Sequence, residues 1–416
     1  MSRPASSADT DGTGRLWIVG ASTRAAAESA LRAGLIPYCS DLFADADLRR
    51  IAQVHPVGDY ARDLPRISAT LPMMPWLYTG GLENRPDLVD QMARQRPLWG
   101  NAGMSLRRAR DPAFVATLLA AAGRPTLQVR PEANPPVADA SWMLKPLAGA
   151  GGRGVRVWDA QTANELPGRE PEPHYFQQRR DGTPISALYC ACPGAVQLIG
   201  IARQLIGVAE VHAAEFAFCG ALAPWTLPPQ QVAELQTIGE IIGTGCGLRG
   251  LFGCDFLLDD RGAWLTEVNP RYTASVELFE YALGLPCLDW HRRACETGEN
   301  GQGEAQSVGQ ELKAALAERK RSVSGRIFGK LILYAAAAGT APDLERCAGS
   351  RESLWEAPEL ADIPPAGSRI EAGQPVCTFL ASAPSAAECE RKMFRKARRI
   401  GEILSAGVGS PGEPIE

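Results

Sequence analysis

The chain has 416 residues, 45% of them hydrophobic and 22% charged, with a formal net charge of -4 at pH 7. This length favours two or three domains, and the composition is that of a globular protein rather than a disordered or fibrous one. No clustered Lys/Arg stripe indicates a nucleic-acid partner, and no apolar run reaches the ~18 residues needed to span a bilayer.

The first segment after the N-terminus reads as the opening of an α/β unit. Residues 1–14 are polar and are expected to form a disordered leader. RLWIVG is an apolar run that predicts a strand, and TRAAAESALRAG predicts a helix with Ser22 or Thr23 as its N-cap. LIPYCSDLF then predicts a second strand. We therefore expect residues 15–109 to form an α/β domain of Rossmann-like type.

The middle of the chain combines helices with alternating strands. DPAFVATLLAAA begins with Asp111 and Pro112, which are favoured at a helix start. The polar, Pro-rich residues 129–141 are interpreted as a linker. Apolar strands are then predicted up to a helix over about 228–243, and two further strands are joined by a turn at Asp260, which indicates a hairpin.

Residues 296–320 are glycine-rich and then helical, which predicts a linker followed by a helix at a domain boundary. Residues 321–404 carry short strand patterns around glycine turns and predict a small β-rich module, interpreted as a structural β-barrel that packs against the site. The tail 405–416 is expected to be disordered. Eleven cysteines include no CxxC pair and only four histidines are present, so we expect reduced cysteines in a cytoplasmic protein without a zinc site.

The stretch WMLKPLAGAGGRGVRVW is the first candidate for chemistry. Its glycines match GxGxxG, but a dinucleotide turn must lead into a helix, and here VRVWD predicts a strand. A P-loop needs a lysine after the glycines, whereas Lys145 precedes them. The remaining interpretation is a hairpin whose flexible glycine loop folds over polyphosphate.

The distribution of lysines supports that interpretation. Only six residues of the chain are lysine, and Lys145 is the sole one in the first 312 residues. A chain that otherwise uses arginine keeps a compact point charge beside the glycine loop. We expect Lys145 to make a charge-assisted contact worth about 1.5–3 kcal/mol with a phosphate group.

The second candidate is LFGCDFLLDDRGAWLTEVNPRYTAS, residues 251–275. Asp255 and Glu267 lie on adjacent strands of the expected hairpin, and Asn269 shares a strand face with Glu267. Two carboxylates and an amide oxygen are hard ligands suited to Mg²⁺. Arg271 follows at the next position on that face, where it is placed to meet a transferring phosphoryl group.

These pieces together resemble the ATP-grasp superfamily. The carrying motifs are Lys-Pro…Gly-Gly-Arg-Gly-Val, a Gln-rich segment ending in Asp-Gly-Thr-Pro-Ile-Ser, and Asp…Glu-Val-Asn-Pro-Arg. The group of predicted ATP-grasp ligases related to biotin carboxylase is the most similar in pattern. The resemblance covers about residues 15–295 and implies an α/β and α+β fold: a Rossmann-like preceding domain, a two-lobed ATP-grasp core over 110–295, and the small C-terminal β-rich module.

The resemblance also implies roles for individual residues. Lys145 would contact the α and β phosphates of ATP, and Arg271 would stabilise the transferred phosphate. The loop that covers the β and γ phosphates would be Gly149, Gly151, Gly152, Arg153 and Gly154. The hinge that presents backbone to adenine would be Gln177, Gln178 and Arg179. One or two Mg²⁺ ions, with Mn²⁺ as an alternative, would be held by Asp255, Glu267 and Asn269.

The sequence departs from the family pattern at three points. Another nucleotide-contacting lysine commonly stands near the helix that begins at residue 111, where this chain has Arg108 and Arg110 as substitutes. The hinge lacks the glutamate often found there, which leaves the ribose contact unassigned. The C-terminal module lacks the lysine that carries biotin or lipoate in carrier domains.

The resemblance implies a carboxylate–amine ligase that activates a small-molecule carboxylate as an acyl phosphate and couples it to an amine. Some relatives are associated with one-carbon carrier cofactors, which suggests cofactor biosynthesis, and a homodimer is a candidate assembly. Two alternatives stay open: a bicarbonate-activating carboxylase, and a nucleotide-binding regulatory protein that hydrolyses nothing. Ser22, Arg24, Glu83 and Asn84 are candidates to face the acceptor pocket.

Overall fold

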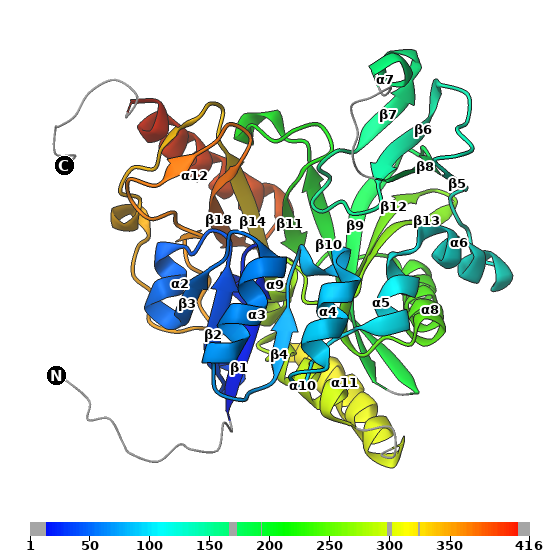
Figure 1. Ribbon diagram of the computed structural model, residues 1–416, viewed down its shortest axis with the longest axis horizontal. Coiled ribbons are helices and arrows are strands. Elements are labelled where there is room, and N and C mark those ends of the chain that lie inside the picture. Colours follow the sequence, from blue (N-terminus) through cyan, green and yellow to red (C-terminus); the bar gives the residue numbers. More distant parts are fainter. Residues whose placement is uncertain (1–13, 166–172, 193, 298–301, 323–324, 407–416) are drawn as a thin grey trace.

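The computed structural model describes residues 14–165, 173–192, 194–297, 302–322 and 325–406. Nearly all of the expected disordered leader and tail therefore lies outside the described residues. Three bodies of structure are visible in Figure 1: an α/β unit at the N-terminus, a large central sheet, and a small lobe that projects from one end of it. No helix in the described ranges combines the length and apolar character that crossing a membrane requires.

The N-terminal unit is a four-stranded parallel sheet in the order β3-β2-β1-β4. Almost every residue of β1 is buried, as expected for a parallel strand covered on both faces. The predicted strand, helix and second strand are confirmed, with Thr23 as the N-cap of α1. The elements are β1 (Arg15–Gly20), α1 (Arg24–Arg32), β2 (Ile36–Asp41), α2 (Ala46–Ile51), β3 (Gln53–Pro56), α3 (Tyr60–Thr70), β4 (Trp76–Tyr78), η1 (Leu82–Asn84), α4 (Pro86–Ala93) and α5 (Gly103–Arg110).

The small lobe is a four-stranded antiparallel sheet in the order β5-β8-β6-β7, flanked by two helices. Asp111 caps the first helix as predicted, accepting hydrogen bonds from the Ala113 and Phe114 amides. The expected linker over 129–141 is wrong in part, because its ends form β5 and the start of β6. The elements are α6 (Pro112–Ala121), β5 (Val129–Pro131), β6 (Asp139–Pro146), β7 (Arg156–Asp159), α7 (Ala160–Glu165) and β8 (His174–Gln178).

The central sheet is antiparallel throughout, with eight strands in the order β13-β12-β9-β10-β11-β14-β18-β16. The predicted hairpin of β12 and β13 is confirmed. The elements of this part are β9 (Thr183–Cys192), β10 (Ala195–Ile206), η2 (Ala209–Val211), β11 (Phe218–Ala223), α8 (Pro229–Cys246), β12 (Gly250–Asp259), β13 (Gly262–Asn269), α9 (Val276–Leu283), α10 (Cys287–Glu296) and α11 (Gln302–Ser322).

The C-terminal segment continues the same sheet. Its elements are β14 (Ile327–Tyr334), β15 (Gly339–Thr340), η3 (Glu345–Cys347), β16 (Leu360–Ala361), β17 (Arg369–Ile370), β18 (Pro375–Ala383) and α12 (Ala386–Ala406). β14 pairs with β11 of the core and with β18, so in the described part of the chain these strands extend the central sheet and do not close into a barrel. The barrel interpretation is wrong, while the domain limits at 110, 295 and 320 stay predictions.

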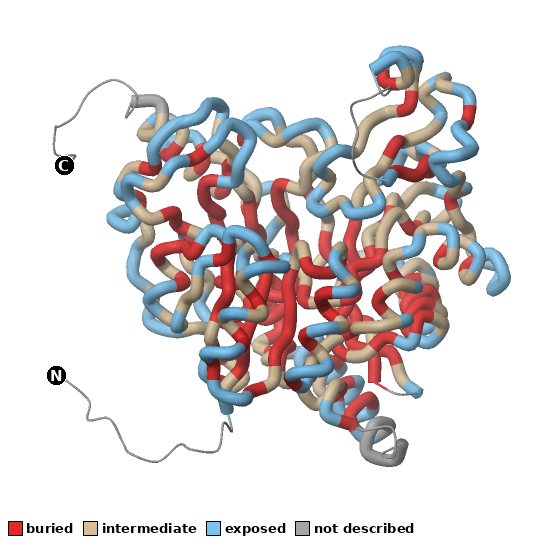
Figure 2. Tube along the Cα trace, in the orientation of Figure 1, coloured by how far each residue is buried: buried red, intermediate tan, exposed pale blue. Residues whose placement is uncertain are grey.

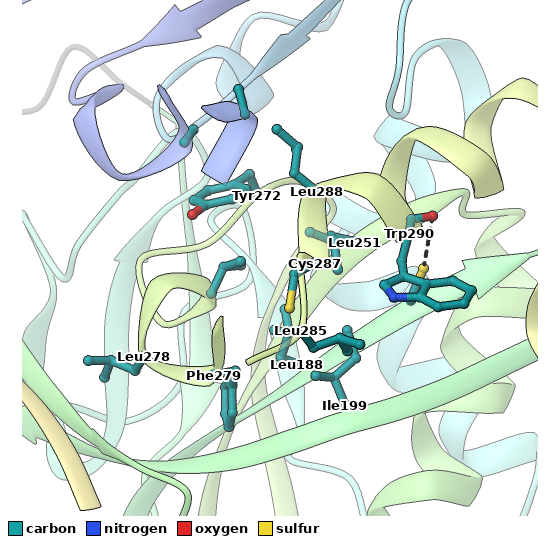
Figure 3. Close-up of a cluster of buried hydrophobic side chains, with 14 of the residues drawn as sticks. Leu188, Ile199, Leu251, Tyr272, Leu278, Phe279, Leu285, Cys287, Leu288 and Trp290 are labelled. Carbon is teal, nitrogen blue, oxygen red and sulfur yellow. Dashed lines mark hydrogen bonds between the residues drawn. The ribbon is translucent and has the colours of Figure 1, made fainter. Parts of the chain in front are cut away.

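The largest core lies between the central sheet and the helices that cover it (Figure 3). Leu188 and Ile199 come from the sheet, and Phe279 and Leu288 from α9 and α10. A Cβ on Gly200 would lie 2.3 Å from the Phe279 ring, so the helix packs where the strand has no side chain. Many of the buried residues lie in the N-terminal sheet and the central sheet (Figure 2). The cysteines are free, as expected. The central sheet and the N-terminal unit are thus well packed, and the cavity described below lies between them and the small lobe.

Candidate active site

A cavity of about 2570 Å³ lies between the N-terminal unit, the small lobe and the central sheet. Its lining includes the whole glycine loop 149–154, the β12–β13 hairpin, and loops of the N-terminal and C-terminal segments. Single-ligand pockets usually measure on the order of 300–1,000 Å³. The cavity therefore has room for a nucleotide together with a second substrate.

The β12–β13 hairpin brings the predicted metal ligands together. Asp255 and Glu267 are direct partners in the strand register, so their side chains share one face of the sheet. Asn269 Nδ2 donates to Asp255 Oδ2 over 2.9 Å, and Gln204 Nε2 donates to Asp255 Oδ1 over 2.8 Å. The Asp255 carboxylate thus has two neutral amide donors, while its nearest charged partner across the strands is another carboxylate.

Three cations surround this hairpin. Arg110 donates from Nη1 to Glu267 Oε1 over 2.6 Å. Lys145 Nζ lies 3.1 Å from both the Gln177 Oε1 atom and the Thr266 carbonyl oxygen. Arg271 donates from Nη2 to Asn269 Oδ1 over 3.0 Å, and its Nε binds Glu83 over 2.7 Å. Glu83 is buried, so the Arg271 guanidinium is held in place from behind.

The two hairpin carboxylates have different charge environments. Burial, followed by the charge of Glu267, raises the pKa of Asp255 to about 7. Burial also acts to raise the pKa of Glu267, but Arg110 and Lys145 outweigh it and hold that pKa below its usual value. Glu267 is therefore ionised at neutral pH, whereas at Asp255 the charges of Arg271 and Lys145 do not outweigh burial and the repulsion of Glu267.

The pair fits a divalent cation for that reason. Two carboxylates and one amide on a single face provide the oxygen ligands that Mg²⁺ prefers, and a cation beside Asp255 would offset the repulsion between the acids. The Asn269 amide now points its nitrogen at Asp255 and its oxygen at Arg271. Within the described ranges no group of three or more His, Cys, Asp or Glu side chains is placed to hold a metal, so the amide is needed to complete the set.

The glycine loop is closed over the cavity. The Phe218 amide donates to the Gly151 carbonyl over 3.1 Å, and the Gly149 carbonyl accepts from Arg110 and Asn84 over 3.2 Å each. Gly152 has a φ of +80°, and a Cβ there would lie 1.8 Å from the Phe216 carbonyl oxygen. Glycine at 152 is therefore required both by the backbone conformation and by the approach of the facing chain.

The hinge residues line the cavity but their amides are occupied. The Gln178 N–H donates to the Gln128 carbonyl over 2.8 Å, and the Arg179 N–H donates to the Ser141 carbonyl over 2.9 Å. An adenine contact through either N–H would require exchange of these bonds. The Gln177 side chain instead faces Lys145 and the Thr266 carbonyl.

The structure separates residues that the sequence left as alternatives. Arg110 reaches the hairpin, whereas the Arg108 guanidinium lies 5.6 Å from the Phe114 ring centroid. Ser22 and Arg24 line the cavity as expected, but Glu83 and Asn84 do not and instead hold Arg271 and the glycine loop. Sequence reasoning missed Gln204, which no motif marks.

Part of the chain is similar in sequence to a known protein family. Residues 117–275 match the family model of the ATP-grasp domain. The large chain of carbamoyl phosphate synthase from Beutenbergia cavernae is 27% identical over 218 residues, and the one from Mycobacterium tuberculosis strain H37Rv is 28% identical over 209 residues. Each alignment covers 46% of this chain but only 19% and 18% of the relatives. The matched part therefore spans about a fifth of those proteins.

Solved structures share the fold along nearly the whole chain. The L-amino acid ligase from Bacillus licheniformis has a TM-score of 0.65 at 16% identity, covering 94% of this chain and 98% of that one. N5-carboxyaminoimidazole synthase from Aspergillus clavatus, in complex with ADP and 5-aminoimidazole ribonucleotide, has a TM-score of 0.63 at 14% identity. The alignment covers 94% of this chain and 100% of that one. The biotin carboxylase domain of Hydrogenobacter thermophilus 2-oxoglutarate carboxylase, in complex with MgADP, ADP and bicarbonate, has a TM-score of 0.65 at 14% identity, covering 92% and 89%.

Proposed function

We propose, starting from the ATP-grasp domain that residues 117–275 form, that this protein is an ATP-dependent carboxylate–amine ligase. It would phosphorylate a carboxylate substrate and join the acyl phosphate to an amine, with release of ADP and phosphate. One observation carries the proposal: paired carboxylates and three cations meet on one wall of a cavity that the glycine loop covers. This is the charge pattern that phosphoryl transfer needs, because that reaction depends on positioning and electrostatics.

The cations would bind the polyphosphate of ATP. Lys145 offers an ammonium group whose hydrogen bonds go to two neutral oxygens, Gln177 Oε1 and the Thr266 carbonyl. Arg110 has a buried Nε atom that finds no hydrogen-bond partner among the described residues, and a phosphate oxygen would supply one. We assign Arg110, not Arg108, the place of the second nucleotide-contacting lysine of the family.

The glycine loop would exclude water. Its backbone spans Gly149 to Gly154 and contacts both the N-terminal unit and the Phe216–Phe218 segment. A closed loop protects an acyl phosphate from hydrolysis and strengthens the charge interactions beneath it. Arg153 lines the cavity from the same loop. The hinge from Gln177 to Arg179 is proposed as the adenine side of the nucleotide site.

The hairpin would support the transfer itself. Asp255, Glu267 and Asn269 would hold one or two Mg²⁺ ions, or Mn²⁺, which when bound neutralise charge on phosphate oxygens. Arg271 is fixed by Glu83 and directed at the Asn269 side chain, so it would stabilise the transferred phosphoryl group.

The test is substrate-dependent release of ADP and phosphate, compared between the wild type and Glu267→Ala. We expect turnover in the presence of a carboxylate and an amine from a broad panel, and its loss in the variant. Equal turnover in the two proteins would contradict the assignment. Nucleotide binding with no turnover across the panel would instead support a regulatory protein.

A bicarbonate-activating carboxylase is the second candidate. Its support comes from the names of two solved structures with the same fold: the biotin carboxylase domain with bound bicarbonate, and N5-carboxyaminoimidazole synthase. This reading predicts ATP turnover that depends on bicarbonate, with no need for another carboxylic acid. The same assay with bicarbonate alone distinguishes the two reactions.

The pathway, the cellular location and the oligomeric state are proposed from the family resemblance alone. A role in the biosynthesis of one-carbon carrier cofactors, a cytoplasmic location and a homodimer are expected on that ground. A screen of metabolites for thermal stabilisation, with a non-hydrolysable ATP analogue present, would identify the substrate pair directly.

A further inference from the structure

The wall of the cavity contributed by the N-terminal unit and the C-terminal segment is acidic. It is formed where the loop after β1, the loop after β2 and the loop after β16 meet. We call Asp45, Asp47 and Asp362 the acidic wall. Asp45 and Asp362 line the same cavity as the glycine loop, so a molecule bound there shares a space with the nucleotide site.

The cations beside the acidic wall are already paired. Arg24 is 1% exposed and donates from Nη1 to Glu277 over 2.7 Å and from Nε to Asp362 over 3.0 Å. Lys330 donates to the same Glu277 over 2.6 Å. Because these two cations also serve a buried glutamate, the acidic wall carries more negative than positive charge.

Two of the neighbouring aspartates have their hydrogen bonds satisfied by the chain. Asp47 accepts from the backbone amides of Asp362 and Ile363, which ties α2 to the C-terminal segment. Asp41 accepts from the Thr23 amide and hydroxyl and from two further backbone amides. Both are therefore explained by the fold.

The Asp45 carboxylate, by contrast, has no hydrogen-bond donor among the described residues. Asp45 is only 4% exposed, it lines the cavity, and among the described residues its carboxylate makes no hydrogen bond or ion pair, not even a cap to its own helix. Burial, followed by the charges of Asp362, Asp41 and Asp47, raises its pKa to about 9. A buried acid without a donor is costly to keep unless a ligand supplies one.

The same region is unsuited to an anion. The amide of Thr23 at the start of α1 lies 2.6 Å from Asp41 Oδ2, so this helix end is already neutralised from within the chain. A phosphate or carboxylate placed beside the acidic wall would meet Asp45 and Asp362, whereas Arg24 and Lys330 already pair with carboxylates of the chain.

We propose that the acidic wall binds a cationic nitrogen group, an ammonium or a guanidinium, with Asp45 as its direct partner. Resting on the ligase function proposed above, this group belongs to the acceptor substrate. Leu42 and Phe43 are 41% and 38% exposed and line the cavity immediately before Asp45, so they offer an apolar contact to the body that carries the cation. The acceptor class is thus a cation on an apolar frame rather than a phosphorylated or acidic molecule.

The experiment measures binding by calorimetry at neutral pH without nucleotide. The probes are benzylamine and butylamine, each compared with its neutral alcohol (benzyl alcohol, butanol) and its carboxylate (benzoate, butyrate). We expect at least one amine to bind more tightly than its alcohol, and we expect any carboxylate that binds on the Lys145 and Arg110 side of the cavity to be unaffected by Asp45→Asn. Asp45→Asn should weaken amine binding about tenfold or more, because asparagine keeps the side-chain volume but cannot release a proton and pair with the cation as an aspartate does.

The control variant is Asp87→Asn, an exposed aspartate that does not line the cavity, and it should leave amine binding unchanged. Thermal melts of both variants establish that the fold is intact. Equal binding of amines and alcohols, or unchanged amine binding in Asp45→Asn, would overturn the proposal. Since no ATP is present, absence of ligase turnover would not affect this result, so the two proposals fail separately.

Discussion

Glu267, whose side chain is 31% exposed, and Asp45, which is buried, are two carboxylates that line one cavity, and their neighbours differ in sign. Glu267 faces Arg110 and Lys145, and its pKa lies below the usual value although burial acts to raise it. Asp45 faces three other aspartates, and its pKa is raised to about 9. Burial penalises both ions, so the neighbouring charges decide which carboxylate stays ionised.

This difference divides the cavity into two ends. Beside Glu267, Arg110 and Lys145 are placed to bind a polyphosphate. Beside Asp45, the carboxyl groups of the acidic wall are placed to bind a cation. The proposed ligase would hold two substrates of different chemistry side by side, and one continuous cavity with a cationic and an acidic wall would allow it. Four changes break or sharpen this comparison, in decreasing order of expected effect.

The largest effect is expected from Glu267→Gln. The amide keeps the shape but removes the charge that pairs with Arg110 and completes the metal-binding set. We expect kcat for ADP release to fall by about 10²–10³-fold, the range seen when a charge-stabilising group is removed from an active site. Glu240→Gln, an exposed change on α8, serves as the control and should keep full turnover.

Lys145→Ala should chiefly affect nucleotide affinity. The loss of one charge-assisted contact to phosphate predicts a Kd for a non-hydrolysable ATP analogue that is about 10- to 100-fold weaker. Lys145→Arg should recover only part of this affinity, because a planar guanidinium differs in shape from a compact ammonium. An unchanged Kd in Lys145→Ala would remove this residue from the nucleotide wall.

Two adjacent glycines test the closed loop. Gly151 and Gly152 both have positive φ, but a Cβ at 151 meets nothing within 4 Å, whereas at 152 it meets the Phe216 carbonyl. Both alanine variants therefore carry backbone strain, and only Gly152→Ala also obstructs closure. We expect kcat/KM for ATP to fall about tenfold further in Gly152→Ala than in Gly151→Ala. Equal values would show that loop closure does not limit the reaction.

The smallest effect is the pH dependence that Asp45 gives to stability. Its folded pKa of about 9 lies above its unfolded value, so the folded chain retains a proton that the unfolded chain has lost. Stability must then fall as pH rises from about 4 to about 9. Asp45→Asn removes this contribution, so the Tm difference between variant and wild type should grow by a few degrees over the window. A constant difference would contradict the assigned environment.

Short sequence motifs were enough to predict the residues that line the cationic side of the cavity. Lys145, the glycine loop and the hairpin from Asp255 to Asn269 lie within short sequence spans, where strand alternation and turn chemistry fix which side chains share a face. The opening strand, helix and strand of the N-terminal unit were predicted for the same reason. Their proposed roles in binding and catalysis remain predictions.

The other end depends on contacts between distant segments. Asp45 and Asp47 lie at the start of α2, more than 300 residues before Asp362. Hydrogen bonds from the Asp362 and Ile363 amides to the Asp47 carboxylate, and from the Ala46 amide to the Ile363 carbonyl, bring the two segments together. The choice of Arg110 over Arg108 likewise depends on how α5 packs. The linker and barrel interpretations failed because β5 and β14 are defined by pairing with remote strands, which local composition does not reveal.

The central claim, activation of a carboxylate as an acyl phosphate, is tested most directly by trapping with hydroxylamine. This small neutral nucleophile replaces the amine and converts an acyl phosphate into a stable hydroxamate. With ATP, Mg²⁺ and a panel of carboxylic acids, the wild type should form a hydroxamate of at least one acid in amounts equal to the ADP released, and Glu267→Gln should form almost none. ATP turnover that bicarbonate alone supports, with no hydroxamate from any acid, would contradict the claim.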